Sequence, residues 1–161
     1  MSGFLDELQA GIGANLTLWE GAILALLAFL AWRKRKEIPL LPVLYSVFLI
    51  LHITLLRRRP GYHEGVRLHF LLWPGMGLMV GNLLNIILYL PLGWAAAQWL
   101  HRRRNSTAWA VLTGAVLSAF CEWVQYVTGR GMADVNDVAF NTLGAAAGVF
   151  FFWVGYKNAG Q

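Results

Sequence analysis

Two acidic residues within otherwise apolar segments are the side chains best suited to do chemistry. Glu122 lies inside one apolar run, with Gln125 three residues later, and Asp137 opens the next apolar run. Residues three apart on a helix share a face, so Glu122 and Gln125 should point the same way. Two carboxylates in unequal surroundings can hold opposite protonation states and divide the roles of acid and base. Glu122 and Asp137 are therefore the candidate catalytic residues, if the protein catalyses a reaction.

Asp137 also begins a stripe along its helix. Asn141, Gly144 and Gly148 follow it at i+4, i+7 and i+11. The two glycines predict that another helix backbone packs closely there, and this packing role is the better interpretation of them. Asp134 stands three residues before Asp137, which is capping-box spacing, so a helix cap and a ligand contact are equally open for it. For Asp137 a functional role is favoured, because Asn141 continues its face.

Amide and guanidinium side chains complete the candidate binding site. Asn85 lies within a third apolar run, where an asparagine often only bridges two helices, for about 1 kcal/mol. Arginine grips phosphate through paired hydrogen bonds, so Arg58 or Arg130 could capture an anion. At least two of the three arginines in Arg57–Arg59 are expected to be lipid-surface anchors instead. The candidate ligand-binding residues are Arg58, Asn85, Gln125, Arg130, Asp134 and Asn141.

The composition places these residues in a membrane protein. Of the 161 residues 58% are apolar and 13% are charged, whereas a soluble domain averages about 45–50% apolar and 25% charged. Spans of roughly 20 apolar residues are expected at 16–32, 38–56, 75–100, 107–128 and 137–156. We therefore predict an all-α, polytopic transmembrane helix bundle with five spans. Polar side chains inside such spans cost free energy and usually mark a functional site. In this chain they fall in the halves of the spans that are expected to face outward.

The basic residues predict the orientation of the bundle. Basic clusters next to a span are retained in the cytoplasm, which puts the amino terminus outside and the carboxyl terminus inside. Five basic residues would then lie outside and eight inside, the latter being Arg33, Lys34, Arg35, Lys36, Arg102, Arg103, Arg104 and Lys157. Residues 1–15 are expected to form a short interfacial helix ahead of the first span. Gly129 predicts a left-handed end to the fourth helix, followed by an outside turn over 129–136.

Several other function classes find no support in the sequence. The net charge of +5 is explained by lipid head groups and topology, and no nucleic-acid signature occurs, so we expect no nucleic-acid partner. Cys121 is the single cysteine, which excludes an internal disulfide and a thiol-rich metal site. The histidines have no metal-ligand spacing. We therefore expect neither a metal nor a cofactor, and membrane lipids as partners.

Two stretches resemble a known family of membrane proteins. The stretch from Asn85 through Pro91 to Gly93 is similar to the N-x-x-x-F-x-P-x-G helix of VanZ-like proteins, with Tyr89 where phenylalanine is common. The family's second motif is matched by Glu122, Gln125, Gly129, Arg130, Asp134, Asp137, Asn141 and Gly144, and Arg58 before Pro60 matches the end of its first core helix. The resemblance covers about residues 38–156.

The resemblance implies a bacterial integral membrane protein of the cytoplasmic membrane with a role in the cell envelope. It divides the chain into an amino-terminal segment with an added span (1–37) and a VanZ-like four-helix domain (38–161). The family takes its name from a protein linked to resistance against teicoplanin and related lipoglycopeptides. That link identifies no reaction for this chain.

Three hypotheses follow. The leading one is an outward-facing polar pocket that binds or modifies an envelope lipid, a lipid-linked glycan or a lipoglycopeptide-type ligand. The second is a small oligomeric transport or permeation protein, which the apolar inner halves of the spans disfavour. The third is an accessory membrane protein with a purely structural polar cluster, in which Asp137 and Arg130 would form a buried ion pair. The oligomeric state is left open.

Overall fold

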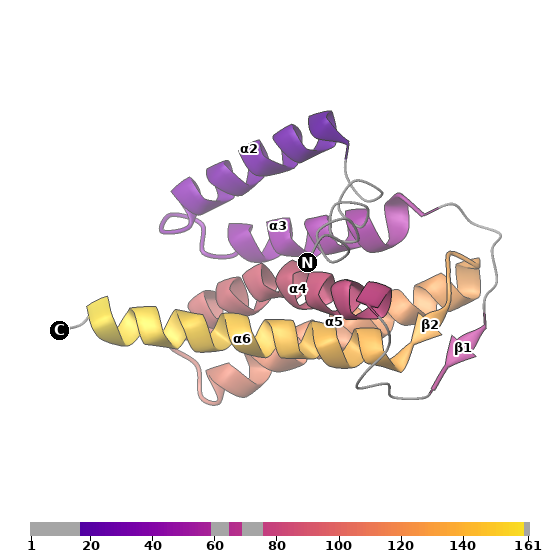
Figure 1. Cartoon of the computed structure of the whole chain (residues 1–161). Helices are drawn as coiled ribbons and strands as arrows, with labels where there is room; N and C mark the ends of the chain where they lie inside the picture. Colours follow the sequence, from indigo (N-terminus) through magenta and orange to yellow (C-terminus); the bar gives the residue numbers. More distant parts are fainter. Residues whose placement is uncertain (1–16, 59–64, 69–75, 160–161) are drawn as a thin grey trace.

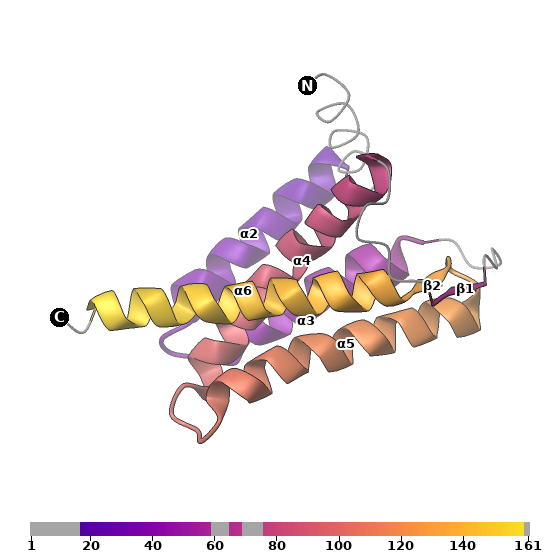
Figure 2. The same cartoon turned by 60° about the horizontal axis from the view of Figure 1, so that its bottom comes forward.

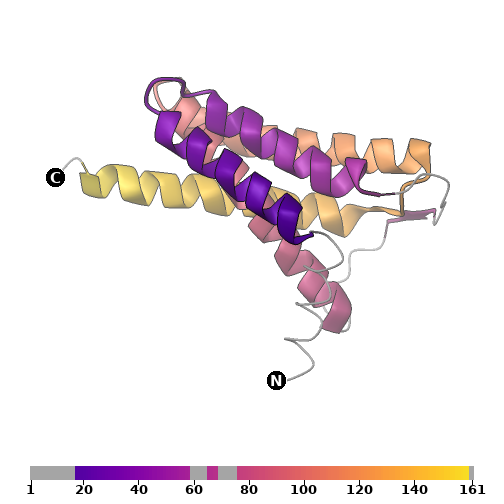
Figure 3. The same ribbon diagram turned by 90° about the horizontal axis from the view of Figure 1, so that it is seen from above.

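The structure, a computed structural model, describes residues 17–58, 65–68 and 76–159. The elements are α2 (Leu18–Lys34), α3 (Leu41–Leu51), the π-helical η1 (His52–Leu56), β1 (Val66–Arg67), α4 (Met76–Leu100), α5 (Ser106–Thr128), β2 (Ala133–Asp134) and α6 (Val135–Ala159). Helices α3 to α6 form a bundle, and α2 lies on the outer side of α3 (Figures 1 and 3). The predicted interfacial helix at 1–15 lies outside the described residues.

The closest packing in the bundle is between α4 and α6, which cross each other (Figure 2). A Cβ atom at Gly144 would collide with the backbone of Ile86, and one at Gly148 with the backbone of Leu90. The prediction that these glycines admit another helix backbone is confirmed, and the partner is α4. Gly93 on α4 in turn faces the backbone of Ala145. This close contact fixes the register in which α4 and α6 present their polar side chains.

Helix α2 is attached to the bundle by few polar contacts. The Tyr45 hydroxyl donates to the carbonyl oxygen of Leu24 over 2.8 Å. At the start of α2, the Glu20 carboxylate lies 3.4 Å from Nε of Arg57 and 3.6 Å from Nε2 of His52. Arg57, expected among the lipid-surface anchors, is therefore ion-paired to α2, and Arg59 lies outside the described residues.

Three of the described helices are long and apolar enough to cross a membrane, over Gly77–Leu100, Ser106–Thr128 and Val135–Asn158. Leu41–Leu56, formed by α3 and η1, is apolar but shorter. The all-α, membrane-compatible class is thus confirmed, and the count of five spans stays a prediction.

Between α5 and α6 the structure differs from the expected turn over 129–136. That segment contains β2, which pairs in parallel with β1, with Val66 opposite Ala133 and Arg67 opposite Asp134. Each strand has only two residues, which is too short for a strand to be recognised from alternating hydrophobicity. The pairing matters because it ties the segment after η1 to the start of α6.

Candidate functional site

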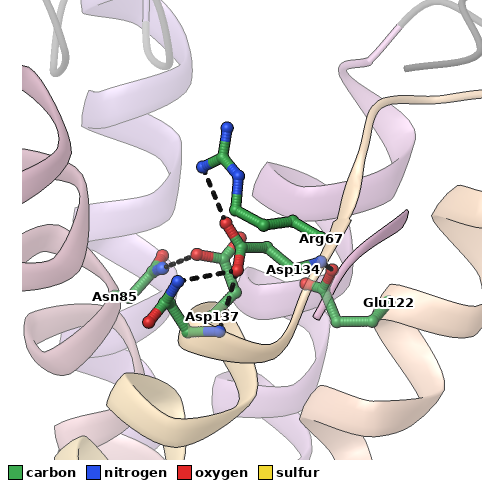
Figure 4. Close-up of polar contacts among 6 residues, drawn as sticks. Arg67, Asn85, Glu122, Asp134 and Asp137 are labelled. Carbon is green, nitrogen blue, oxygen red and sulfur yellow. Dashed lines mark hydrogen bonds and ion pairs between the residues drawn. The ribbon is translucent and has the colours of Figure 1, made fainter. Parts of the chain in front are cut away.

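Side chains from α4, α5, β1, β2 and the start of α6 come together at one end of the bundle, and Figure 4 shows Asn85, Glu122, Asp134 and Asp137 among them. Helix α5 ends at Gly129, whose φ of 59° is the left-handed conformation that was predicted. The chain then passes through β2 directly into α6. We call the polar side chains at this end the polar cluster; its members are Arg58, Arg67, Asn85, Glu122, Gln125, Asp134, Asn136 and Asp137.

Asp134 caps the amino-terminal end of α6. Its Oδ1 accepts hydrogen bonds from the backbone amide of Asn136 over 2.9 Å and from the Asn136 side-chain amide over 3.0 Å. This geometry satisfies amide groups that the first turn of a helix otherwise leaves unpaired. Its other oxygen, Oδ2, lies 3.1 Å from NH1 of Arg67. Of the two roles left open for Asp134, the helix cap is therefore present.

Glu122 points into the bundle and not at the surrounding lipid. Only 7% of the residue is exposed, and Oε2 accepts a hydrogen bond from the backbone amide of Asp134 over 2.9 Å. That amide belongs to the capping residue of α6, so the carboxylate of α5 binds the start of the next helix. Glu122 also interacts electrostatically with Asp134 and Asp137.

Asp137 is held by α4. Its Oδ1 accepts a hydrogen bond from the Asn85 side-chain amide over 2.8 Å. The interaction crosses between the two helices whose backbones pack most closely, which explains how residues 52 positions apart meet. The predicted buried pair between Asp137 and Arg130 is not formed; instead, NH1 of Arg130 donates to the backbone carbonyl of Leu55. Arg130 therefore ties the turn after α5 to η1.

Arg58 is the exposed cation of the polar cluster. Its NH1 donates to Oε1 of Gln125 over 2.9 Å, while Gln125 itself is 1% exposed. A Cβ atom on Gly131 would lie 2.8 Å from Arg58 NH1, so the glycine leaves room for the guanidinium group. Arg58 also interacts electrostatically with both Glu122 and Asp137. One exposed guanidinium group thus stands beside two shielded carboxylates.

Asn141 lies deeper, one turn below Asp137 along α6. Its side-chain amide donates to the Ser118 hydroxyl over 2.8 Å, and its Oδ1 is buried with no partner among the described residues. Nearby, the hydroxyl of fully buried Tyr89 lies beside Ser118 and Cys121. Asn141 therefore belongs to a polar layer beneath the polar cluster.

Two members of the polar cluster were missed in the sequence. Arg67 was counted only as an outside charge, and Asn136 was not considered. Val66, Arg67 and Leu68 alternate apolar and basic residues, but three residues are too short a pattern to predict a strand and so to single out Arg67. Asn136 carried no comparable signal, because its role depends on where α6 begins.

The polar cluster combines acids, amides and cations at the end of apolar helices. Three mutually interacting carboxylates, those of Glu122, Asp134 and Asp137, lie within reach of the arginines at positions 58 and 67. Such a set can hold a polar head group by hydrogen bonds and ion pairing and can exchange protons with it. Within the described part of the chain, no group of three or more His, Cys, Asp or Glu residues is placed to hold a metal ion.

Comparison with known proteins gives one match. The family model described as VanZ/LLP1 matches residues 43–156, which include α4, α5 and most of α3 and α6. Neither the curated proteins nor the solved structures contain a significant match. Helix α2 lies outside the matched range.

Proposed function

Because the chain belongs to the VanZ/LLP1 family of membrane proteins, we propose that its polar cluster binds the polar head of an envelope lipid or of a lipid-linked glycan. A lipoglycopeptide-type ligand, which also joins an acyl chain to a polar glycan, fits the same description. The apolar helices would lie along the hydrocarbon chain, and the polar cluster would meet the head group at the outer face of the bacterial cytoplasmic membrane.

The observation that carries this proposal is the position of Arg58. Its guanidinium group is exposed, and one of its nitrogen atoms is fixed by buried Gln125. An arginine has five donors, so the remaining ones can pair with a phosphate or another anion. If Arg58 served only to stabilise the fold, burial of its guanidinium group among its hydrogen-bond partners would stabilise the protein more than its exposed position does.

Glu122 and Asp137 supply the proton chemistry in this proposal. Each accepts one hydrogen bond within the chain, which fixes its carboxyl group and leaves lone pairs for a ligand. Asn85 orients Asp137, and the backbone amide of Asp134 orients Glu122. If the ligand is modified, one carboxyl group would donate a proton while the other accepts one.

The test replaces each carboxylate by its amide. In Glu122→Gln and Asp137→Asn the side-chain oxygen can still accept from the Asp134 amide or from Asn85, so we expect both variants to fold and to lose less unfolding free energy than a variant without the acceptor. We expect both variants to retain less head-group ligand from a total membrane lipid extract, measured by mass spectrometry of the purified protein. Glu122→Leu, which loses the acceptor, is the control for a folding defect. Undiminished ligand retention in both amide variants counts against the proposal.

A purely structural polar cluster is the second candidate. It is favoured by the fact that Glu122, Asp134 and Asp137 all accept hydrogen bonds from the chain itself. In that case Glu122→Leu should unfold the protein more easily, while the amide variants behave as the unaltered protein in every assay. The two candidates therefore differ in the amide variants.

A further inference from the structure

A second site lies at the opposite end of the bundle from the polar cluster. There a cavity of about 330 Å³ opens between the last turns of α2, the first turns of α3 and the second half of α4. Its volume falls at the lower end of the range of about 300–1,000 Å³ found for ligand pockets. The wall includes Ala28, Trp32, Tyr45, Ser46, Pro91 and Trp94.

The two hydroxyl-bearing side chains of the cavity wall already donate their protons within the chain. The Tyr45 hydroxyl donates to the Leu24 carbonyl over 2.8 Å, and the Ser46 hydroxyl donates to the Pro42 carbonyl over 2.8 Å. Apart from the indole N–H groups, the other lining side chains are hydrocarbon. The wall is therefore mostly apolar and suits a hydrocarbon chain.

A basic run, which we call the basic border, adjoins the cavity wall in the sequence. Residues 33–36, which read Arg-Lys-Arg-Lys, directly follow Trp32. The Arg35 guanidinium carbon lies 3.6 Å from the centroid of the Trp32 ring, and Lys34 is paired with Glu37 at 2.8 Å. Arg33 and Lys36 are exposed and have no ion pair among the described residues. Two cations without an ion pair among the described residues therefore follow Trp32 of the cavity wall within four residues.

We infer that this cavity and residues 33–36 bind one anionic phospholipid, with an acyl chain in the cavity and the phosphate on Arg33 and Lys36. The apolar interior favours an acyl chain, and the basic border favours a head group with a negative charge. Trp32 and Trp94, whose ring centroids are 5.2 Å apart, form the wall where chain and head group meet, a position that tryptophan favours in membranes. Because α2 lies outside the matched range 43–156, the site depends on a helix that is additional to the family region.

The experiment uses the full-length protein in bilayer nanodiscs that contain equal amounts of phosphatidylglycerol and phosphatidylcholine with identical acyl chains. After release into the gas phase, native mass spectrometry counts the lipids that remain bound. We expect one phosphatidylglycerol to be retained in preference to phosphatidylcholine. The double variant Arg33→Gln/Lys36→Gln should lower this preference, by about fivefold for each charge removed.

A cavity variant and two controls distinguish binding at this site from the effects of any bulky substitution on α2 or any loss of positive charge. Ala28→Phe fills the cavity and should remove the retained lipid, whereas Ala25→Phe on the exposed side of α2 should not. Arg102→Gln/Arg103→Gln removes the same charge from another loop and should leave the preference unchanged. Equal retention of both lipids, or undiminished retention in Ala28→Phe, overturns the inference. Loss of the lipid in Ala25→Phe as well, or in Arg102→Gln/Arg103→Gln, also contradicts it.

Discussion

At the level of single residues, Asp134 connects the fold and the candidate site. One of its carboxylate oxygens caps α6 through Asn136, and the other pairs with Arg67. Its backbone amide binds Glu122, so its position also sets the position of the carboxylate proposed for chemistry. A change at Asp134 is therefore expected to alter stability first and the geometry of the polar cluster second.

The contribution of the cap can be separated from that of the charge. Alanine at position 134 removes both, while asparagine caps a helix about as well as aspartate but has no charge. We expect Asp134→Ala to lower the free energy of unfolding by about 1–2 kcal/mol and Asp134→Asn to lower it by clearly less. Unfolding by denaturing detergent, followed by circular dichroism, measures both. Equal losses in the two variants would show that the ion pair with Arg67, and not the cap, is the important contact.

At the level of elements, the contact between α4 and α6 positions the polar cluster. Asn85 reaches Asp137 because Gly144 and Gly148 let the two helices approach to backbone contact about two and three turns further along α6. Side chains on two helices held this close keep a fixed register, which is the condition for a preorganised site.

This contact should be sensitive to a single methyl group. Gly144→Ala places a Cβ against the backbone of Ile86, so we expect a loss of about 1–3 kcal/mol from overpacking. Gly155→Ala on the same helix meets nothing within 4 Å and is the matched control. Thermal unfolding of the detergent-solubilised variants provides the measurement. If both variants melt at the same temperature, the packing account of α4 and α6 is wrong.

The sequence predicted the long elements well and the short ones poorly. Helices α4, α5 and α6 begin and end within three residues of the predicted spans, because apolar length and Gly129 determine them locally. The pairing of β1 with β2 joins segments 67 residues apart and leaves no local signal. The sequence likewise does not predict the π-helical turn of η1, because its five residues are too few to show a change in hydrophobic period.

The candidate site was predictable to a similar extent. The depth of each residue in its predicted span was enough to predict that Asn85, Glu122, Gln125 and Asp137 lie at one level of the membrane. The structure brings these four residues together at one end of the bundle. The partner of each side chain was not predictable, because it depends on helix rotation and on the turn after α5. Arg130 shows this, since it binds the Leu55 carbonyl and not Asp137.

At the level of the whole molecule, the proposal requires the polar cluster to face away from the cytoplasm. The excess of basic residues at the other end predicts this orientation. Reporter fusions after Lys34 and Arg103 should be active only with a cytoplasmic reporter, and fusions after Tyr62 and Met132 only with an extracytoplasmic one. The opposite pattern would place the polar cluster in the cytoplasm and remove the envelope ligand from consideration.

Ligand retention by an Arg58 variant tests the central claim most directly. Unaltered protein, Arg58→Gln and the neighbouring control Arg57→Gln are purified from the same membranes, and the bound lipids and glycolipids are identified by mass spectrometry. The account predicts an anionic envelope lipid or lipid-linked glycan that is enriched over its abundance in the membrane, retained by Arg57→Gln and lost from Arg58→Gln although that variant remains folded. Bulk membrane lipids alone, in the same amounts in all three proteins, would contradict it.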